Sequence, residues 1–241
     1  MRLNFICVAL MIASACGTKN LFDCDGGYAR SHCTERTKEE DARIALDNGD
    51  YDTAIELLSA LIAEEPENYR RYPLMSAAYA ARSGFDILNV VTANFGGNDS
   101  ILKTMTSFLP TPTSKGDAYA QSLEDMNSAN QTLLAIPADQ RLSTSSDKYA
   151  TSAVLQLTLY QAAYGVMLLN KFTYGASGYD PSLLATMSAA DAAAILTAFA
   201  GAAGAGSGGA GSAASSAVSA ISGQPGATDQ EKLAAWSQAA R

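Results

Sequence analysis

The side chains best suited to chemistry are few, and they lie near the start of the chain. The 241 residues include one histidine, His32, and four cysteines, Cys7, Cys16, Cys24 and Cys33. A single histidine rules out a His-rich metal site, and a Ser or Cys triad would have to be built around that one residue. No other catalytic constellation is present in the sequence. We therefore predict that the protein is not an enzyme and has no metal site.

The first residues have the three-part layout of an export signal. A positively charged start is followed by an apolar stretch at residues 3–12, which is too short to span a membrane, and then by small residues at 13–15. The run Ile12-Ala13-Ser14-Ala15-Cys16 resembles the lipobox of bacterial lipoproteins, although Leu or Val is commoner in the place of Ala13. An ordinary cleaved signal with an incidental cysteine is the alternative.

The lipobox resemblance implies an anchor and a location. The signal peptide would be residues 1–15, and Cys16 would carry a diacylglycerol and an acyl chain such as palmitate, with no other cofactor. In many such proteins an acidic residue directly after the lipidated cysteine keeps the protein on the inner membrane. Here that position is occupied by Gly17. We therefore expect a lipid anchor in the bacterial outer membrane, with the protein facing the periplasm.

Two cysteines remain in the predicted tether, residues 16–37. Because the periplasm is oxidising, Cys24 and Cys33 are expected to form a disulfide across a turn-rich loop. The competing hypothesis is a zinc site made by both thiols, His32, and Asp23 or Asp25. The absence of a close Cys-x-x-Cys pair favours the disulfide.

The composition indicates a folded protein with an acidic surface. The formal net charge is -8, from 16 basic and 24 acidic residues, which argues against a nucleic-acid partner. Hydrophobic residues make up 48% and charged residues 17%, so there is ample apolar surface to bury. We expect residues 38–241 to form one all-α domain.

Residues 38–95 have the pattern of helical hairpins. Apolar residues recur at helical spacing on both sides of Asn48-Gly49-Asp50, and the second run ends near Pro66. The residues Gly49, Asp50, Tyr51, Ala54, Leu58 and Pro66 resemble the second half of a tetratricopeptide repeat. This resemblance implies degenerate tetratricopeptide-like hairpins stacked into a solenoid, about two of them before residue 95.

Residues 117–241 are expected to form a helical bundle that completes the core. Asp117 is predicted to cap a helix through about Ala135, and a broad apolar face predicts a second long, mostly buried helix. Residues 189–222 contain one charge and are rich in Ala, Gly and Ser. A flexible linker, a membrane helix and a closely packed helical hairpin are all possible there, and the predicted capping box of Ser188 with Asp191 favours the hairpin. Thr228 and Glu231 predict a further capping box, at the start of a short C-terminal helix.

These features favour binding as the function. Stacked helical repeats present surfaces for peptides or helices, so we expect a scaffold or adaptor for another envelope protein, with homo-oligomers also possible. The alternative comes from the run from Tyr79 to Leu88 and the small-residue helices, which resemble the T component associated with TRAP transporters. That family implies a solute-binding protein as partner and a hydrophobic ligand. The candidate groove is formed by Tyr72, Tyr79, Tyr160 and Tyr164.

Overall fold

The computed structural model describes residues 37–85, 105–106, 108–141, 148–175, 177–205 and 209–239. The chain divides into two compact units, Met1–Glu40 and Asp41–Arg241, and almost all of the described residues belong to the second. The predicted signal peptide, the lipid attachment site Cys16, and the Cys24–Cys33 pair with its neighbour His32 all lie outside the described residues. Those predictions remain predictions.

The described part of the chain is all-α, as expected. Ten α-helices are joined by two 3-10 helices, η2 (Gly116–Ala118) and η3 (Pro181–Thr186), and by one antiparallel pair of two-residue strands, β1 (Tyr174–Gly175) and β2 (Gly178–Tyr179). The α-helices are α2 (Lys38–Asp47), α3 (Tyr51–Glu64), α4 (Arg71–Ser83), α7 (Pro112–Lys115), α8 (Tyr119–Leu134), α9 (Ala138–Arg141), α10 (Lys148–Lys171), α11 (Ala189–Ala205), α12 (Gly209–Ser222) and α13 (Asp229–Ala239).

The turn between α2 and α3 forms where the sequence predicts it. Gly49 has a φ of 77°, a left-handed conformation that glycine adopts without steric cost. The side chain of Asp50 then accepts a hydrogen bond from the backbone N–H of Thr53 and caps α3. Ala54 is fully buried, and α3 ends before Pro66. The predicted hairpin boundaries are confirmed.

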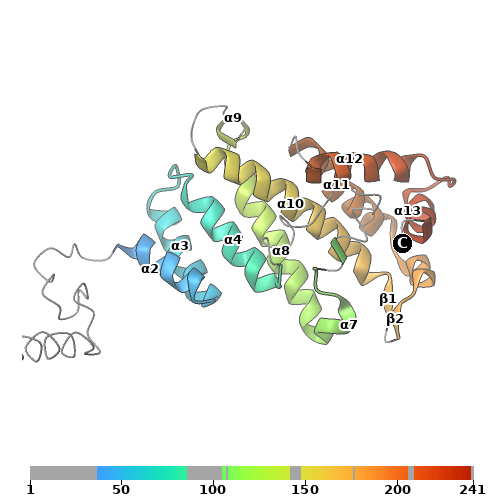
Figure 1. The fold of residues 1–241 in the computed structure, drawn as a ribbon, viewed down its shortest axis with the longest axis horizontal. Helices are drawn as coiled ribbons and strands as arrows, with labels where there is room; N and C mark the ends of the chain where they lie inside the picture. Colours follow the sequence, from blue (N-terminus) through green and yellow to red (C-terminus); the bar gives the residue numbers. More distant parts are fainter. Residues whose placement is uncertain are drawn as a thin grey trace, which may run out of the picture. The chain divides into compact units, whose positions relative to one another are not determined.

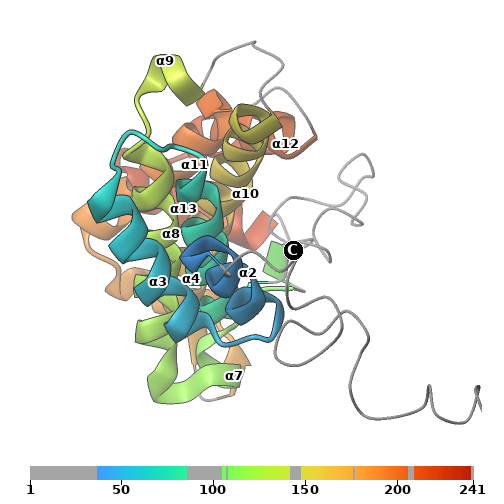
Figure 2. The same cartoon turned by 90° about the vertical axis from the view of Figure 1, so that its left-hand side faces the viewer.

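The larger helices pack in chain order. Helix α3 contacts α4, α4 contacts α8, α8 contacts α10, α10 contacts α11, and α11 contacts α12. Figure 1 shows α3, α4, α8 and α10 side by side, with α11 and α12 beyond α10. In Figure 2, which looks from the α3 side, α3 lies in front of α4. One large apolar core runs through most of these helices.

Helix α10 is the central core helix, as its broad apolar face predicts. Its buried side chains include Leu157, Tyr160, Val166, Met167 and Leu169. Its segment Ser152–Lys171 is also long and apolar enough to cross a membrane, but 67% of its apolar window is buried inside the fold. Burial of that kind is typical of the core helix of a globular domain.

The small-residue segment forms a packed helical pair. Ser188 and Asp191 make the predicted capping box, in which each side chain bonds the other residue's backbone N–H at 3.1 and 3.3 Å. Helices α11 and α12 then contact each other, with Phe199 and Ile221 buried. The closely packed hairpin hypothesis is therefore correct for the described residues.

The last helix begins as predicted. In its capping box, Thr228 Oγ1 accepts a hydrogen bond from the backbone N–H of Glu231 at 3.2 Å. The Glu231 carboxylate accepts hydrogen bonds from the backbone N–H groups of Thr228 and Ala227, and these bonds lower the pKa of Glu231. Local sequence is enough to specify this helix start.

Two predictions about connections differ from the structure. Asp117 does not cap α8: it lies in η2, and the residue before α8 is Ala118, which makes no side-chain cap. The 3-10 turn leads the chain into α8, so the helix needs no Asp cap. The predicted loop at residues 173–187 contains the strand pair and η3, which begins at Pro181 behind the cap Asp180.

Candidate functional site

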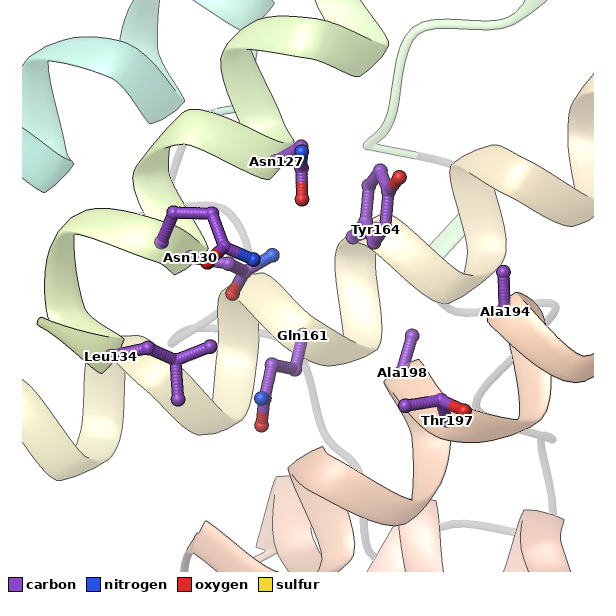
Figure 3. Close-up of a pocket in the computed structure, with 9 residues that line it drawn as sticks. Asn127, Asn130, Leu134, Gln161, Tyr164, Ala194, Thr197 and Ala198 are labelled. Atoms are coloured by element: carbon purple, nitrogen blue, oxygen red, sulfur yellow. The ribbon is translucent and has the colours of Figure 1, made fainter. Parts of the chain in front are cut away.

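A pocket opens between helices α8, α10 and α11. Its volume is about 240 Å³. Figure 3 shows Asn127, Asn130 and Leu134 from α8 facing Gln161 and Tyr164 from α10, with α11 forming the remaining wall. The complete lining is Asn127, Asn130, Gln131, Leu134, Gln161, Tyr164, Ala194, Thr197 and Ala198.

The lining follows helical spacing on all three elements. Helix α8 contributes residues 127, 130, 131 and 134, which are the positions i, i+3, i+4 and i+7 of one helix face. Helix α10 contributes residues three apart, and α11 contributes residues 194, 197 and 198. Three regular helix faces therefore build the site, and no loop is needed to position it.

Asn130 is held in one orientation by the helices beside it. Its Nδ2 donates to the carbonyl oxygens of Met126 and Tyr160, each at 3.2 Å, and the residue is 3% exposed. Because both bonds need the N–H₂ group, the other side-chain atom must be the oxygen. That oxygen, Oδ1, has no hydrogen-bond partner among the described residues. An unpaired buried acceptor costs folding free energy, about 1–3 kcal/mol.

Gln161, which also lines the pocket, carries a second unpaired oxygen. Its Oε1 is buried and makes no hydrogen bond within the described parts of the chain. Its amide lies directly over Gly201 of α11, where an added Cβ would lie 2.7 Å from Nε2 and 2.8 Å from Oε1. Only glycine leaves room for this amide at its present position; a larger residue at 201 would require the flexible amide to shift.

The pocket carries no charge at physiological pH. Tyr164 is the only titratable residue of the lining, and burial raises the pKa of its phenol above the ordinary value of 10.0. The site therefore offers hydrogen-bond donors and acceptors with a partly apolar wall. It is suited to binding a neutral group. Within the described ranges no cluster of His, Cys, Asp or Glu could hold a metal ion.

No protein-family model, curated protein or solved structure matches this chain. The function must be inferred from the residues of the site and from the predicted anchor.

The four tyrosines of the predicted groove have different environments. Tyr72 and Tyr160 are buried: the Tyr72 hydroxyl donates to the carbonyl of Pro66 at 2.8 Å, and the Tyr160 ring packs edge-on against Phe85 at 5.4 Å. Tyr79 is half-buried beneath the Arg82 guanidinium, which lies 5.3 Å from its ring centre. Tyr164 is the member of the set that lines the described pocket.

A second polar cluster joins three helices around Arg82 of α4. The guanidinium donates to both oxygens of Asp125 in α8, at 2.7 and 3.1 Å, and to Asp52 in α3 at 2.5 Å. Gln121 also donates to Asp125, at 3.0 Å. The hydrogen bond with Asp125 is the largest cause of the raised Arg82 pKa, so the arginine stays charged. The arrangement links α3, α4 and α8 to one another, because the guanidinium N–H groups donate to carboxylates of α3 and α8.

The pocket residues on α8 were not predicted, although the sequence contains a signal for them. Three side-chain amides and a leucine recur at i, i+3, i+4 and i+7, which is the spacing normally sought only among apolar residues. A stripe of uncharged amides beside a buried helix face could have indicated a site. The contributions of α10 and α11 depend on which helices become neighbours.

Proposed function

We propose that this protein is a lipid-anchored, periplasm-facing helical-repeat adaptor that binds another envelope protein. The packing of each large helix on the next one in the chain carries the proposal. That arrangement is typical of solenoids, whose lateral surfaces bind partners. We place the binding surface around the uncharged pocket of α8, α10 and α11.

We further infer that the first helices are degenerate tetratricopeptide-like hairpins and that the whole array is a solenoid. Three observations support this: the left-handed turn at Gly49, the fully buried small residue Ala54 where paired helices approach, and the end of α3 before Pro66. Ala45, Ala54, Ile55 and Ala78 of the first helices form a small apolar cluster of their own, and the later helices, which replace the repeat consensus with small residues, build the larger core with α4.

The test of the adaptor role is site-specific photo-crosslinking in the living envelope. Leu134, at the pocket, and Ile44, on α2, are large apolar residues with matched exposures of 40% and 39%. Each is replaced in the full chain by a photo-reactive phenylalanine analogue. We expect one discrete crosslinked protein from position 134 and none from position 44. Equal patterns from both positions, or no product from either, would contradict the proposal.

The second candidate is a component of a TRAP-type transport system that partners a solute-binding protein and handles a hydrophobic ligand. The ligand-sized pocket with its partly apolar wall favours it. The identity of the protein crosslinked at position 134 separates the two: a periplasmic solute-binding protein supports transport, and an outer-membrane assembly protein supports an adaptor. A product with the mass of two copies indicates a homo-oligomer.

The anchor has its own prediction. Replacing Cys16 with serine removes the thiol that would carry the diacylglycerol, so we expect loss of palmitate labelling and retention of the unprocessed precursor. The protein should also move out of the outer-membrane fraction, because the acyl chains supply the membrane affinity. Normal processing and fractionation of the serine variant would show that the segment is an ordinary signal.

A further inference from the structure

The turn between α2 and α3 contains the one Asn-Gly dipeptide of the chain, Asn48-Gly49. Asparagine is chemically labile in this context, because glycine has no Cβ to keep its backbone nitrogen away from the side-chain amide of the residue before it. Both residues are exposed, and the Asn48 side chain makes no hydrogen bond within the described ranges. Two groups that can react with each other therefore lie side by side at the protein surface.

The reaction between them is deamidation through a succinimide. The backbone nitrogen of Gly49 loses its proton and attacks Cγ of Asn48; a new N–Cγ bond forms, the Cγ–Nδ2 bond breaks, and ammonia leaves with that proton. Water then opens the succinimide ring at either carbonyl carbon. One opening leaves aspartate at position 48, and the other leaves isoaspartate, in which the main chain runs through Cγ.

The closed turn blocks the first step. The Gly49 N–H donates to the carbonyl of Leu46 at 3.1 Å, and the Asp50 N–H donates to the carbonyl of Ala45 at 2.8 Å. With the left-handed Gly49, these two bonds form a Schellman motif that ends α2. While the motif holds, the nitrogen that must attack is engaged with Leu46, so the reaction needs the turn to open.

Helix α2 is held to the fold by little apolar surface. Its buried side chains are two alanines, Ala42 and Ala45. Ala45 packs in the small cluster with residues of α3 and α4, which is distinct from the large core. Elements with few buried apolar contacts open locally without global unfolding. The turn at Asn48 should therefore open more often than the core helices do.

We propose that Asn48 is a deamidation site gated by the α2–α3 turn: it is protected while the turn is closed and reacts when α2 separates from α3. The product then opposes reclosure. A carboxylate at position 48 lies between Asp47 and Asp50 at the C-terminus of α2, where the helix dipole disfavours negative charge. Isoaspartate also adds a main-chain atom inside the hydrogen-bonded turn. The assignment does not depend on the proposed envelope partner.

The test is peptide mapping by mass spectrometry after incubation of the detergent-solubilised full chain at mildly alkaline pH. Trypsin releases one peptide, residues 44–70, that contains both Asn48 and the internal control Asn68, which precedes Tyr69. We expect Asn48 to react at least about tenfold faster in concentrated urea than in native buffer, because two hydrogen bonds hold the native turn closed. Asn68 should react far more slowly in both. A smaller ratio at Asn48 overturns the gate, and an intact Asn48 in urea overturns the site.

Ala45→Gly and Ala193→Gly are a matched pair of variants. Each replaces a helix alanine with glycine, but Ala45 is buried in α2 and Ala193 is exposed on α11. In native buffer Ala45→Gly should raise the Asn48 rate at least about fivefold, because glycine favours opening of the helix. Ala193→Gly should leave the rate unchanged, and unshifted Trp236 emission shows that both variants stay folded. An unchanged rate in Ala45→Gly, or an equal rise in Ala193→Gly, overturns the gate.

Asn48→Asp isolates the charge of the product, and Asn48→Ser is its uncharged control. Amide hydrogens of α2 should exchange about threefold faster in Asn48→Asp than in Asn48→Ser, because a negative charge at a helix C-terminus destabilises the last turn by roughly that factor. Exchange in α8 should be the same in both. Equal exchange in α2 overturns the effect assigned to the product.

Discussion

Replacing Arg82 with methionine is expected to lower the free energy of unfolding by about 3 kcal/mol at neutral pH. The change leaves the Asp125 carboxylate, whose side chain is 3% exposed, without its positive partner inside the helix stack. Losses from breaking a buried pair run from about 3 to 5 kcal/mol, and the lower end applies because Gln121 still donates to Asp125. The measurement is urea denaturation of the solubilised full chain, followed by the fluorescence of its single tryptophan, Trp236.

The Arg82 cluster contains its own control. Asp52 contacts the same guanidinium, but its side chain is 82% exposed, so Asp52→Asn should cost less than about 1 kcal/mol. The double variant Arg82→Met with Asp125→Leu should recover much of the loss, because no unpaired charge then remains buried. If Arg82→Met costs no more than Asp52→Asn, the pair does not tie α4 to α8.

Most helices could be predicted because their signals are local. The capping boxes at Ser188 and Thr228, and the glycine turn at Gly49, each involve residues within four positions of one another. Apolar spacing likewise identified the buried faces of α3 and α10. Asp117 failed as a cap because the sequence does not reveal the short 3-10 turn that starts α8.

The tertiary contacts could not be predicted in the same way. Arg82 and Asp125 are 43 residues apart, and nothing in the sequence of either helix identifies the other as its neighbour. In the sequence Gly201 is only one of many small residues between 189 and 222, whereas in the structure the Gln161 amide lies over it. Of the four tyrosines chosen for the groove, only Tyr164 lines the pocket, because spacing alone does not separate a buried aromatic from a pocket residue.

A substitution at Phe199 distinguishes two hypotheses for the Ala-, Gly- and Ser-rich segment. In one, α11 is packed in the core, and in the other the segment is a flexible linker. Phe199 is fully buried, its ring lies against the backbone of Gly165 in α10, and it packs edge-on against Trp236 of α13 at 5.9 Å. A Cβ on Gly165 would lie 3.2 Å from the Phe199 ring, so the two helices approach closely there. Phe199→Ala should therefore cost about 4 kcal/mol, the sum of lost burial and a cavity that cannot close.

The matched control for Phe199 is Leu196→Ala on the same helix. Leu196 is only half-buried, so its truncation should cost about 1 kcal/mol. Phe199→Ala should also expose Trp236 to water and shift its emission to longer wavelength, which Leu196→Ala should not do. In a flexible linker both changes would be nearly neutral and the emission would not move. If Phe199→Ala lowers the free energy of unfolding by less than about 1 kcal/mol, α11 is not packed between α10 and α13. The α11 side of the pocket, where Gly201 lies against the Gln161 amide, would then not form either.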